Sequence, residues 1–186
     1  MVRAAYSTGK PALGVGPGNV PAIIDGSADI KLTVSSVIHS KTFDNGMICA
    51  SEQAVVVAKE VYDAFKAELQ AQGCYFVDEE EGERLRELLF GTGVLNSQIV
   101  GQTAKKIAEL CGIRAYDDCK VLVAEVSSVG ADEVFSQEKL SPVLAMYKAD
   151  TFEDGLSKAD GLVRGGGFGH TAAIYIDERS AKERLS

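Results

Sequence analysis

The residue with the clearest chemical potential in this sequence is Cys49, which lies in the segment FDNGMICAS at residues 43–51. A helical pattern precedes this segment and a strand pattern follows it, and the pair Asn45-Gly46 predicts a turn between the two. Backbone N–H groups freed at such a junction can activate a thiol or stabilise a developing oxyanion. Most free cysteines are small buried residues, and Cys49 taken alone favours that alternative. The case for a nucleophile therefore depends on the surrounding residues.

Two other segments carry side chains suited to chemistry. Glu138 stands shortly before a predicted strand, where a carboxylate at a sheet edge can accept hydrogen bonds from a ribose. A surface glutamate is the simpler interpretation. His170 follows four glycines within residues 165–169, which let the backbone approach a ligand closely, and it can donate a hydrogen bond or transfer a proton. A structural role for His170 is the slightly favoured alternative.

Glycines at positions 14, 16 and 18 suggest a phosphate-binding loop at first sight. Their spacing differs from the dinucleotide fingerprint, and a strand pattern at residues 21–25 follows them where a helix is needed. We therefore interpret these glycines as allowing a tight turn and close packing.

Helical and strand patterns alternate along the chain. The predicted strands lie at residues 21–25, 55–57, 74–77, 121–126, 142–147 and 172–176. The predicted helices lie at residues 28–42, with Ser27 as the cap, and at 61–69, 80–89, 102–110 and 152–163. Continuous apolar strands between helices are typical of a buried, mainly parallel sheet. The sequence predicts one α/β domain with a mainly parallel sheet flanked by helices.

Composition excludes several kinds of partner. The chain has 186 residues and a net charge of −8, and it has no basic patch, so nucleic acid is not an expected partner. Its apolar runs are too short for a bilayer, so no membrane is expected. The four cysteines lack CxxC spacing and zinc-type pairing with the histidines, so we expect no metal site and a reducing cytoplasm. The acidic run at 78–81 is interpreted as a solvated helix start.

Four segments resemble the aldehyde dehydrogenase superfamily, and most closely the CoA-acylating acetaldehyde dehydrogenase part of bacterial bifunctional aldehyde-alcohol dehydrogenases. They are AAYSTGKP at 4–11, GVGPGNVPAIID at 14–25, FDNGMICASEQ at 43–53 and GHTA at 169–172. The likeness runs from end to end, with the motifs in the same order. It implies the catalytic-domain fold of that superfamily.

The resemblance also implies roles. Cys49 would add to an aldehyde carbonyl, hydride would pass to NAD, and CoA would remove the resulting acyl thioester, with the whole reaction reversible. The Cys49 N–H would form part of an oxyanion hole, and His170 would be a second catalytic residue. Glu138 would contact the nicotinamide ribose, and Pro142 joins it in the cofactor-binding set. The implied partners are a small aldehyde and acyl-CoA, in a homo-oligomeric parent protein.

One departure from the superfamily favours transfer to CoA. Hydrolytic aldehyde dehydrogenases carry a glutamate base in the segment aligned with residues 14–18, where this chain offers Val15 and Gly16. Without that base, water is poorly activated and the thioester should survive until CoA arrives. A hydrolytic aldehyde dehydrogenase and a non-catalytic assembly module remain the two alternatives.

The ends of the sequence suggest a fragment. Residues 2–6 look like the end of a helix and residues 178–186 like the start of another. The resemblance makes residues 1–186 the thiol-bearing catalytic domain and puts the NAD-binding domain before it. We expect this chain to fold but not to oxidise acetaldehyde with NAD on its own.

Overall fold

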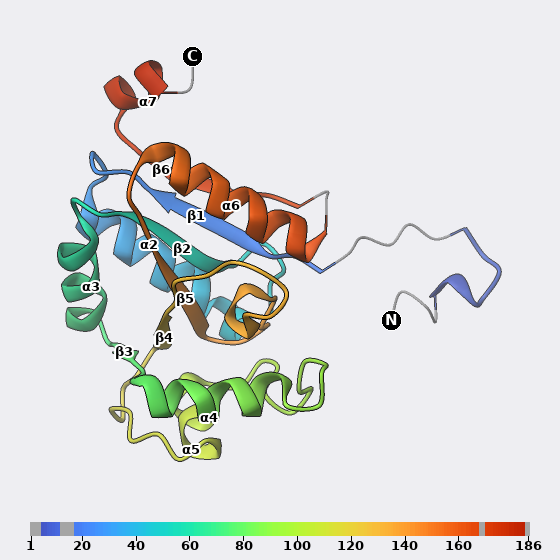
Figure 1. Ribbon diagram of the computed structural model, residues 1–186. Helices are drawn as coiled ribbons and strands as arrows, with labels where there is room; N and C mark the ends of the chain where they lie inside the picture. Colours follow the sequence, from blue (N-terminus) through green and yellow to red (C-terminus); the bar gives the residue numbers. More distant parts are fainter. Residues whose placement is uncertain (1–4, 12–16, 168–169, 185–186) are drawn as a thin grey trace.

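The computed structural model describes residues 5–11, 17–167 and 170–184. Its centre is a six-stranded sheet, shown in Figure 1, with strand order β3-β4-β5-β2-β1-β6. All of its neighbouring strands are parallel. The strands are β1 (Val20–Ile24), β2 (Glu52–Ala58), β3 (Cys74–Phe76), β4 (Val121–Glu125), β5 (Val143–Ala149) and β6 (Ala173–Tyr175). The predicted α/β fold with a parallel sheet is confirmed.

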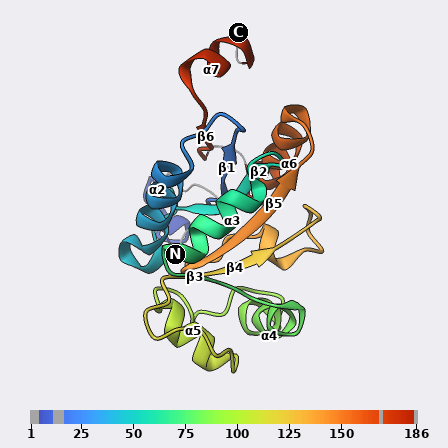
Figure 2. The same ribbon diagram turned by 90° about the vertical axis from the view of Figure 1, so that its left-hand side faces the viewer.

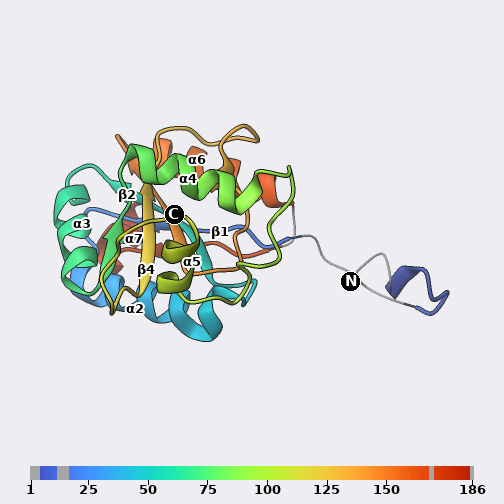
Figure 3. The ribbon, with the colours of Figure 1, turned by 90° about the horizontal axis from the view of Figure 1, so that it is seen from below.

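Helices cover both faces of this sheet. The covering helices are α2 (Ile30–Thr42), α3 (Tyr62–Ala71), α4 (Glu79–Phe90), α5 (Ala104–Leu110) and α6 (Phe152–Gly166), with short 3₁₀ helices η1 (Phe43–Gly46) and η2 (Val134–Ser136). Helix α7 (Glu178–Arg184) buries none of its residues. Figure 2 shows α2 and α6 on opposite sides of the sheet. In Figure 3, α4 lies on the same side as α6, and α2 lies on the other side. The arrangement is three layers deep.

The core has two halves because alternate strand residues point to opposite faces. In β2, Val55 and Val57 pack with Phe65 of α3 on one face. Ala54 and Val56 belong to the cluster on the other face, which includes residues of α4, α5 and α6. A strand buried on both faces needs a continuous apolar run, which is the pattern seen in the sequence.

The start of α2 differs from the prediction. The cap is Asp29, whose carboxylate accepts a hydrogen bond of 3.0 Å from the Leu32 N–H. Ser27 instead donates its hydroxyl proton to Asp25, with an oxygen–oxygen distance of 2.7 Å. Both side chains suit a cap, but Asp25 holds Ser27 in the turn after β1. The predicted cap at Ser27 is therefore wrong by two residues.

The start of α4 and the end of α6 are also informative. Asp78 and Glu81 form a reciprocal capping box, so the acidic run does begin a helix. Helix α6 continues through Gly165 and Gly166, which the sequence placed in a loop. The backbone of Gly166 packs closely on Asn19, and a Cβ added to Gly166 would lie 2.5 Å from the Asn19 Cβ.

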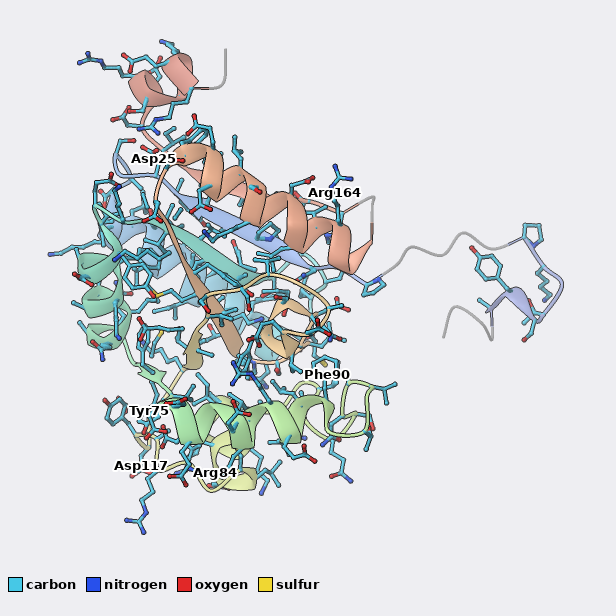
Figure 4. All side chains as sticks on the ribbon, in the orientation of Figure 1. Asp25, Tyr75, Arg84, Phe90, Asp117 and Arg164 are labelled. Carbon is cyan, nitrogen blue, oxygen red and sulfur yellow. The ribbon has the colours of Figure 1, made fainter. Side chains whose placement is uncertain are left out.

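The segments of chemical interest all precede parallel strands. Residues 17–19 lead into β1, residues 47–51 into β2, residues 138–142 into β5 and residues 170–172 into β6. They meet at one end of the sheet, which we call the amino edge. In Figure 4, Asp25 marks the opposite end of β1, while Arg164 lies towards the amino edge, near the end of α6. Among the described residues, no helix has the length and apolar character needed to span a membrane.

Candidate active site

Cys49 is the exposed thiol of the chain. Its side chain lies in the turn between η1 and β2 and is open to solvent, whereas Cys74, Cys111 and Cys119 are buried. Burial raises the pKa of Cys74 to about 12 and that of Cys111 to about 11, so these thiols stay protonated near neutral pH. The alternative that Cys49 is a small buried residue is therefore wrong.

Gly18 is the point at which Cys49 and His170 meet. A Cβ added to Gly18 would lie 2.4 Å from the Cys49 carbonyl oxygen and 2.7 Å from Nε2 of His170. Both groups therefore contact the bare Cα of this glycine, from the loop before β2 and the segment before β6. The close packing interpreted from the glycine-rich sequence is present at this position.

The hydrogen bonding of His170 defines which nitrogen carries the proton. Nδ1 accepts a hydrogen bond of 3.0 Å from the Thr171 N–H. The neutral imidazole therefore has its proton on Nε2, the nitrogen that faces Gly18. In this state His170 presents a hydrogen-bond donor beside the Cys49 loop.

Glu138 closes the group from a third segment. Its Oε1 accepts a hydrogen bond of 3.0 Å from the Gly18 N–H. Burial raises the pKa of this half-buried carboxyl, while the Gly18 bond, His170 and two lysines oppose the rise. Cys49, Gly18, His170 and Glu138 thus form one cluster, although they come from four separate segments of the sequence.

Left-handed backbone conformations mark the same segments. Within the described residues, the non-glycine residues with positive φ are Asp44 (49°), Asn45 (50°) and Leu140 (44°). The Asn45 side chain donates to the Gly101 carbonyl (2.9 Å), and the Gly101 N–H donates to the Leu140 carbonyl (3.1 Å). Residues in such conformations persist where contacts fix them, and they concentrate at functional sites. Here the contacts tie the loop before Cys49 to the segment after Glu138.

This chain is similar in sequence and fold to known aldehyde dehydrogenases. The model of the aldehyde dehydrogenase family matches residues 1–74. An aldehyde-alcohol dehydrogenase of Clostridium acetobutylicum is 52% identical over the whole chain. The crystal structure of an acetylating aldehyde dehydrogenase from Geobacillus thermoglucosidasius superposes with a TM-score of 0.92 at 46% identity, and the match covers 100% of this chain and 41% of that one. The resemblance to aldehyde dehydrogenases is confirmed.

The chain spans 22% of the length of the Clostridium relative. A third aldehyde dehydrogenase, the propionaldehyde dehydrogenase of Rhodopseudomonas palustris, is 25% identical with a TM-score of 0.83. That match covers 98% of this chain and 41% of the other, and the structure is described as containing bound CoA and an acylated cysteine.

Pro142 occupies a different place in this aldehyde dehydrogenase-like fold. It is buried at the start of β5, and its carbonyl accepts a hydrogen bond of 2.9 Å from the Leu122 N–H in β4. Its described hydrogen bond thus belongs to the sheet and not to the cluster around Gly18.

A cofactor contact by Pro142 stays a prediction, and so do the catalytic roles of Cys49 and His170. Val15, Gly16 and Gly169 lie outside the described residues.

A buried polar group that was not predicted lies next to the cluster. Lys41, Lys139 and Gln53 are fully buried. Gln53 Oε1 accepts hydrogen bonds from Lys41 Nζ (3.2 Å) and from the Lys139 backbone N–H (3.1 Å). One signal for Lys41 is its position on the apolar face of α2, seven residues after Val34. Among the described residues, no group of histidine, cysteine and acidic side chains is arranged to hold a metal ion.

Two cavities lie at opposite ends of the sheet. One of about 440 Å³ opens beside Glu138 and is also lined by Pro17, Phe90 and Leu95. A second, of about 590 Å³, lies at the carboxyl ends of the strands beside Asp25. Open α/β sheets usually bind ligands at the carboxyl ends of their strands. The predicted catalytic side chains of this chain gather at the amino edge instead.

Lys41 should make stability depend on pH. Burial lowers its pKa from 10.5 to about 7, against the pull of Glu52 and Glu138. Between these values the unfolded chain binds more protons than the folded chain, so stability rises with pH in this window. Below about pH 7, Lys41 is charged in both the folded and the unfolded chain, so burying the charge lowers the free energy of unfolding by its full amount. Lys41→Met should therefore stabilise the chain below pH 7 by a few kcal/mol, since one pKa unit corresponds to about 1.4 kcal/mol.

Urea unfolding of the two proteins across this pH range measures the effect. The stability gained by Lys41→Met should shrink as the pH rises towards 10.5. Lys31→Met is the matched control, because Lys31 is exposed on the same helix. A gain that is equal at every pH would show that the charge of Lys41 is not responsible.

Proposed function

We propose that this chain is the thiol-bearing catalytic domain of a CoA-acylating, NAD-dependent aldehyde dehydrogenase. The observation that carries the proposal is the meeting of Cys49, His170 and Glu138 around Gly18 at one edge of the sheet. The similarity to proteins described as aldehyde-alcohol and acetylating aldehyde dehydrogenases supports it. Because the chain spans 22% of such a relative, the activity of the whole protein is part of the proposal.

The proposed chemistry begins at the exposed thiol. The Cys49 thiolate adds to the carbonyl carbon of an aldehyde, which forms a C–S bond and places negative charge on the oxygen. The Nε2–H of His170 and the Cys49 N–H would donate hydrogen bonds to that oxygen. Bound NAD would supply the hydride acceptor, and loss of hydride from this carbon would leave a thioester on Cys49.

The second half of the reaction returns Cys49 to its starting state. The thiolate of CoA attacks the thioester carbonyl, acyl-CoA leaves, and Cys49 is released as a thiolate. Glu138 fits the role of ribose ligand, because within the described residues only its Oε1 is engaged, by the Gly18 N–H. A carboxylate oxygen that remains accessible can accept a hydrogen bond from a ribose hydroxyl.

Transfer to CoA is favoured over hydrolysis for a reason of sequence. Val15 and Gly16 stand where the hydrolytic enzymes carry their glutamate base, and neither can accept a proton from water.

The proposal includes a small aldehyde and acyl-CoA as substrates, a homo-oligomeric whole protein and a cytoplasmic setting. Four free cysteines suit a reducing compartment. The proposal also assigns the binding of the NAD phosphates to a part of the whole protein outside residues 1–186.

Thioester exchange tests the proposal without NAD. The chain is incubated with acetyl-CoA, and its peptides are analysed for an acetyl group by mass spectrometry. We expect an acetyl thioester on Cys49 that persists in water and returns to acetyl-CoA when CoA is added. An absence of acetylation would favour a non-catalytic module. Rapid release of free acetate would favour the hydrolytic alternative.

A further inference from the structure

Gln53 lies where three segments of the proposed site join. It is fully buried in β2, four residues after Cys49. Its Oε1 accepts from Lys41 at the end of α2 and from the Lys139 N–H beside Glu138. Its Nε2 donates to the Ser51 carbonyl at 3.4 Å, which directs the amide so that the oxygen faces the two lysines.

The two donors depend on this oxygen in different ways. The Lys139 side chain is occupied elsewhere, since its ammonium donates to the carbonyls of Phe135 (2.8 Å) and Gln137 (2.7 Å). Its backbone N–H bonds to Gln53, so this contact holds the residue after Glu138. Lys41 donates to Gln53 within the described residues, at the point where α2 leads into the segment that contains Cys49. Removing the acceptor would leave buried donors without partners, which is costly.

These contacts form a closed circuit. Gln53 bonds to Lys139, the neighbouring Glu138 bonds to the Gly18 N–H, and Gly18 packs against the carbonyl of Cys49. The covalent chain from Cys49 to Gln53 completes the circuit. The position of Glu138 relative to Cys49 is therefore fixed from both sides.

We propose that Gln53 is a positioning residue that sets the placement of Glu138 against Cys49 through its shared side-chain oxygen. This proposal rests on the proposed function, because it gives the two positioned residues their chemical roles. Lys41 already faces two acids, Glu52 and Glu138, and its like charge Lys139, so the task requires a hydrogen-bond acceptor and no further charge.

An isosteric pair of variants provides the test. Gln53→Met removes the acceptor, whereas Gln53→Glu keeps an acceptor for the two lysines and loses only the longer hydrogen bond to the Ser51 carbonyl. Amide hydrogen exchange is followed by NMR at Lys139, which touches Gln53, and at Gly18, which is bonded to Glu138 instead. We expect both amides to exchange about tenfold faster in Gln53→Met, equivalent to about 1.4 kcal/mol, and to be protected again in Gln53→Glu.

A remote amide serves as the control. The Lys59 N–H donates to the Ala149 carbonyl at the other end of the sheet, and its exchange should not change. If Lys139 responds while Gly18 does not, Gln53 has only a local structural role and the proposal is overturned. If Gln53→Met does not fold, Gln53→Asn is used in its place. Asparagine is one methylene shorter, so its amide oxygen is withdrawn from the two lysines, and the exchange of the Lys139 and Gly18 amides is measured in the same way.

Thioester exchange separates this proposal from the proposed function. Gln53→Met should slow acetylation of Cys49 by acetyl-CoA, and Gln53→Glu should restore it to within a few-fold. If the unmodified chain is not acetylated but the Gly18 amide still responds, the proposed function fails and the positioning by Gln53 stands. If the unmodified chain is acetylated and Gly18 does not respond, the positioning fails alone.

Discussion

Replacing Cys49 with serine is expected to slow the exchange of acetyl groups between acetyl-CoA and labelled CoA by a factor of about 10³ or more, as for other catalytic nucleophiles. A serine hydroxyl ionises far less readily than a thiol and is a much weaker nucleophile near neutral pH. The change adds no atoms, and the side chain is exposed, so folding should be unaffected. The rate is measured as the transfer of label from CoA into acetyl-CoA.

Cys111→Ser is the matched control for this substitution. The Cys111 thiol is buried and donates to the Ile107 carbonyl at 3.0 Å, a contact that a serine hydroxyl can retain. Exchange should continue at the unmodified rate in this variant. A loss of less than tenfold in Cys49→Ser would mean that another group carries the acyl transfer.

The second large effect is expected for Gly18→Ala. The added methyl carbon would lie 2.4 Å from the Cys49 carbonyl oxygen, 2.7 Å from Nε2 of His170 and 2.9 Å from its Cδ2. Side-chain carbons do not approach other atoms so closely, so the Cys49 loop or the His170 ring must move. A displacement of about 1 Å at a reacting group can cost about 10² in rate. We therefore expect acetyl exchange to fall by about 10²-fold.

Gly26→Ala separates this effect from a general cost of replacing glycine. Gly26 follows β1 at the opposite end of the sheet, and an added Cβ there would meet only Glu60, at 4.0 Å. This variant should exchange acetyl groups normally. If Gly18→Ala keeps full activity, the Cys49 loop tolerates displacement and the cluster around Gly18 is not the reacting geometry.

Much of the fold could be predicted because the four inner strands of the sheet, β4, β5, β2 and β1, are buried along most of their length. Continuous runs such as Val55–Val57 have few alternatives to a buried parallel strand. Element ends were harder to place. Both Ser27 and Asp29 can cap a helix, and the choice between them depends on Asp25, a contact made only in the folded chain.

The site was predictable only in part. Cys49 and His170 could be singled out because their residue types carry chemistry at glycine-rich turns. Gly18 matters because it has no side chain, which lets Cys49 and His170 approach its backbone. That requirement can be recognised only once the residues packed around Gly18 are known. Lys41, Gln53 and Lys139 escaped prediction because charged and amide side chains are normally exposed. Their burial follows from three separate segments converging on one oxygen.

The amino-edge location has a consequence for how a nucleotide would approach. Helix α2 ends at Thr42, just before the segment that contains Cys49, and α6 ends at Gly166 beside Asn19, so both present C-terminal carbonyl groups to this edge. The dipoles of such helix ends repel anions, whereas helix N-termini attract phosphate. Burial lowers the pKa of both nearby lysines, Lys41 and Lys139, and so reduces the positive charge that they bring to this edge. A dinucleotide held by Glu138 would therefore present its uncharged sugar to this edge and direct its diphosphate away from the sheet.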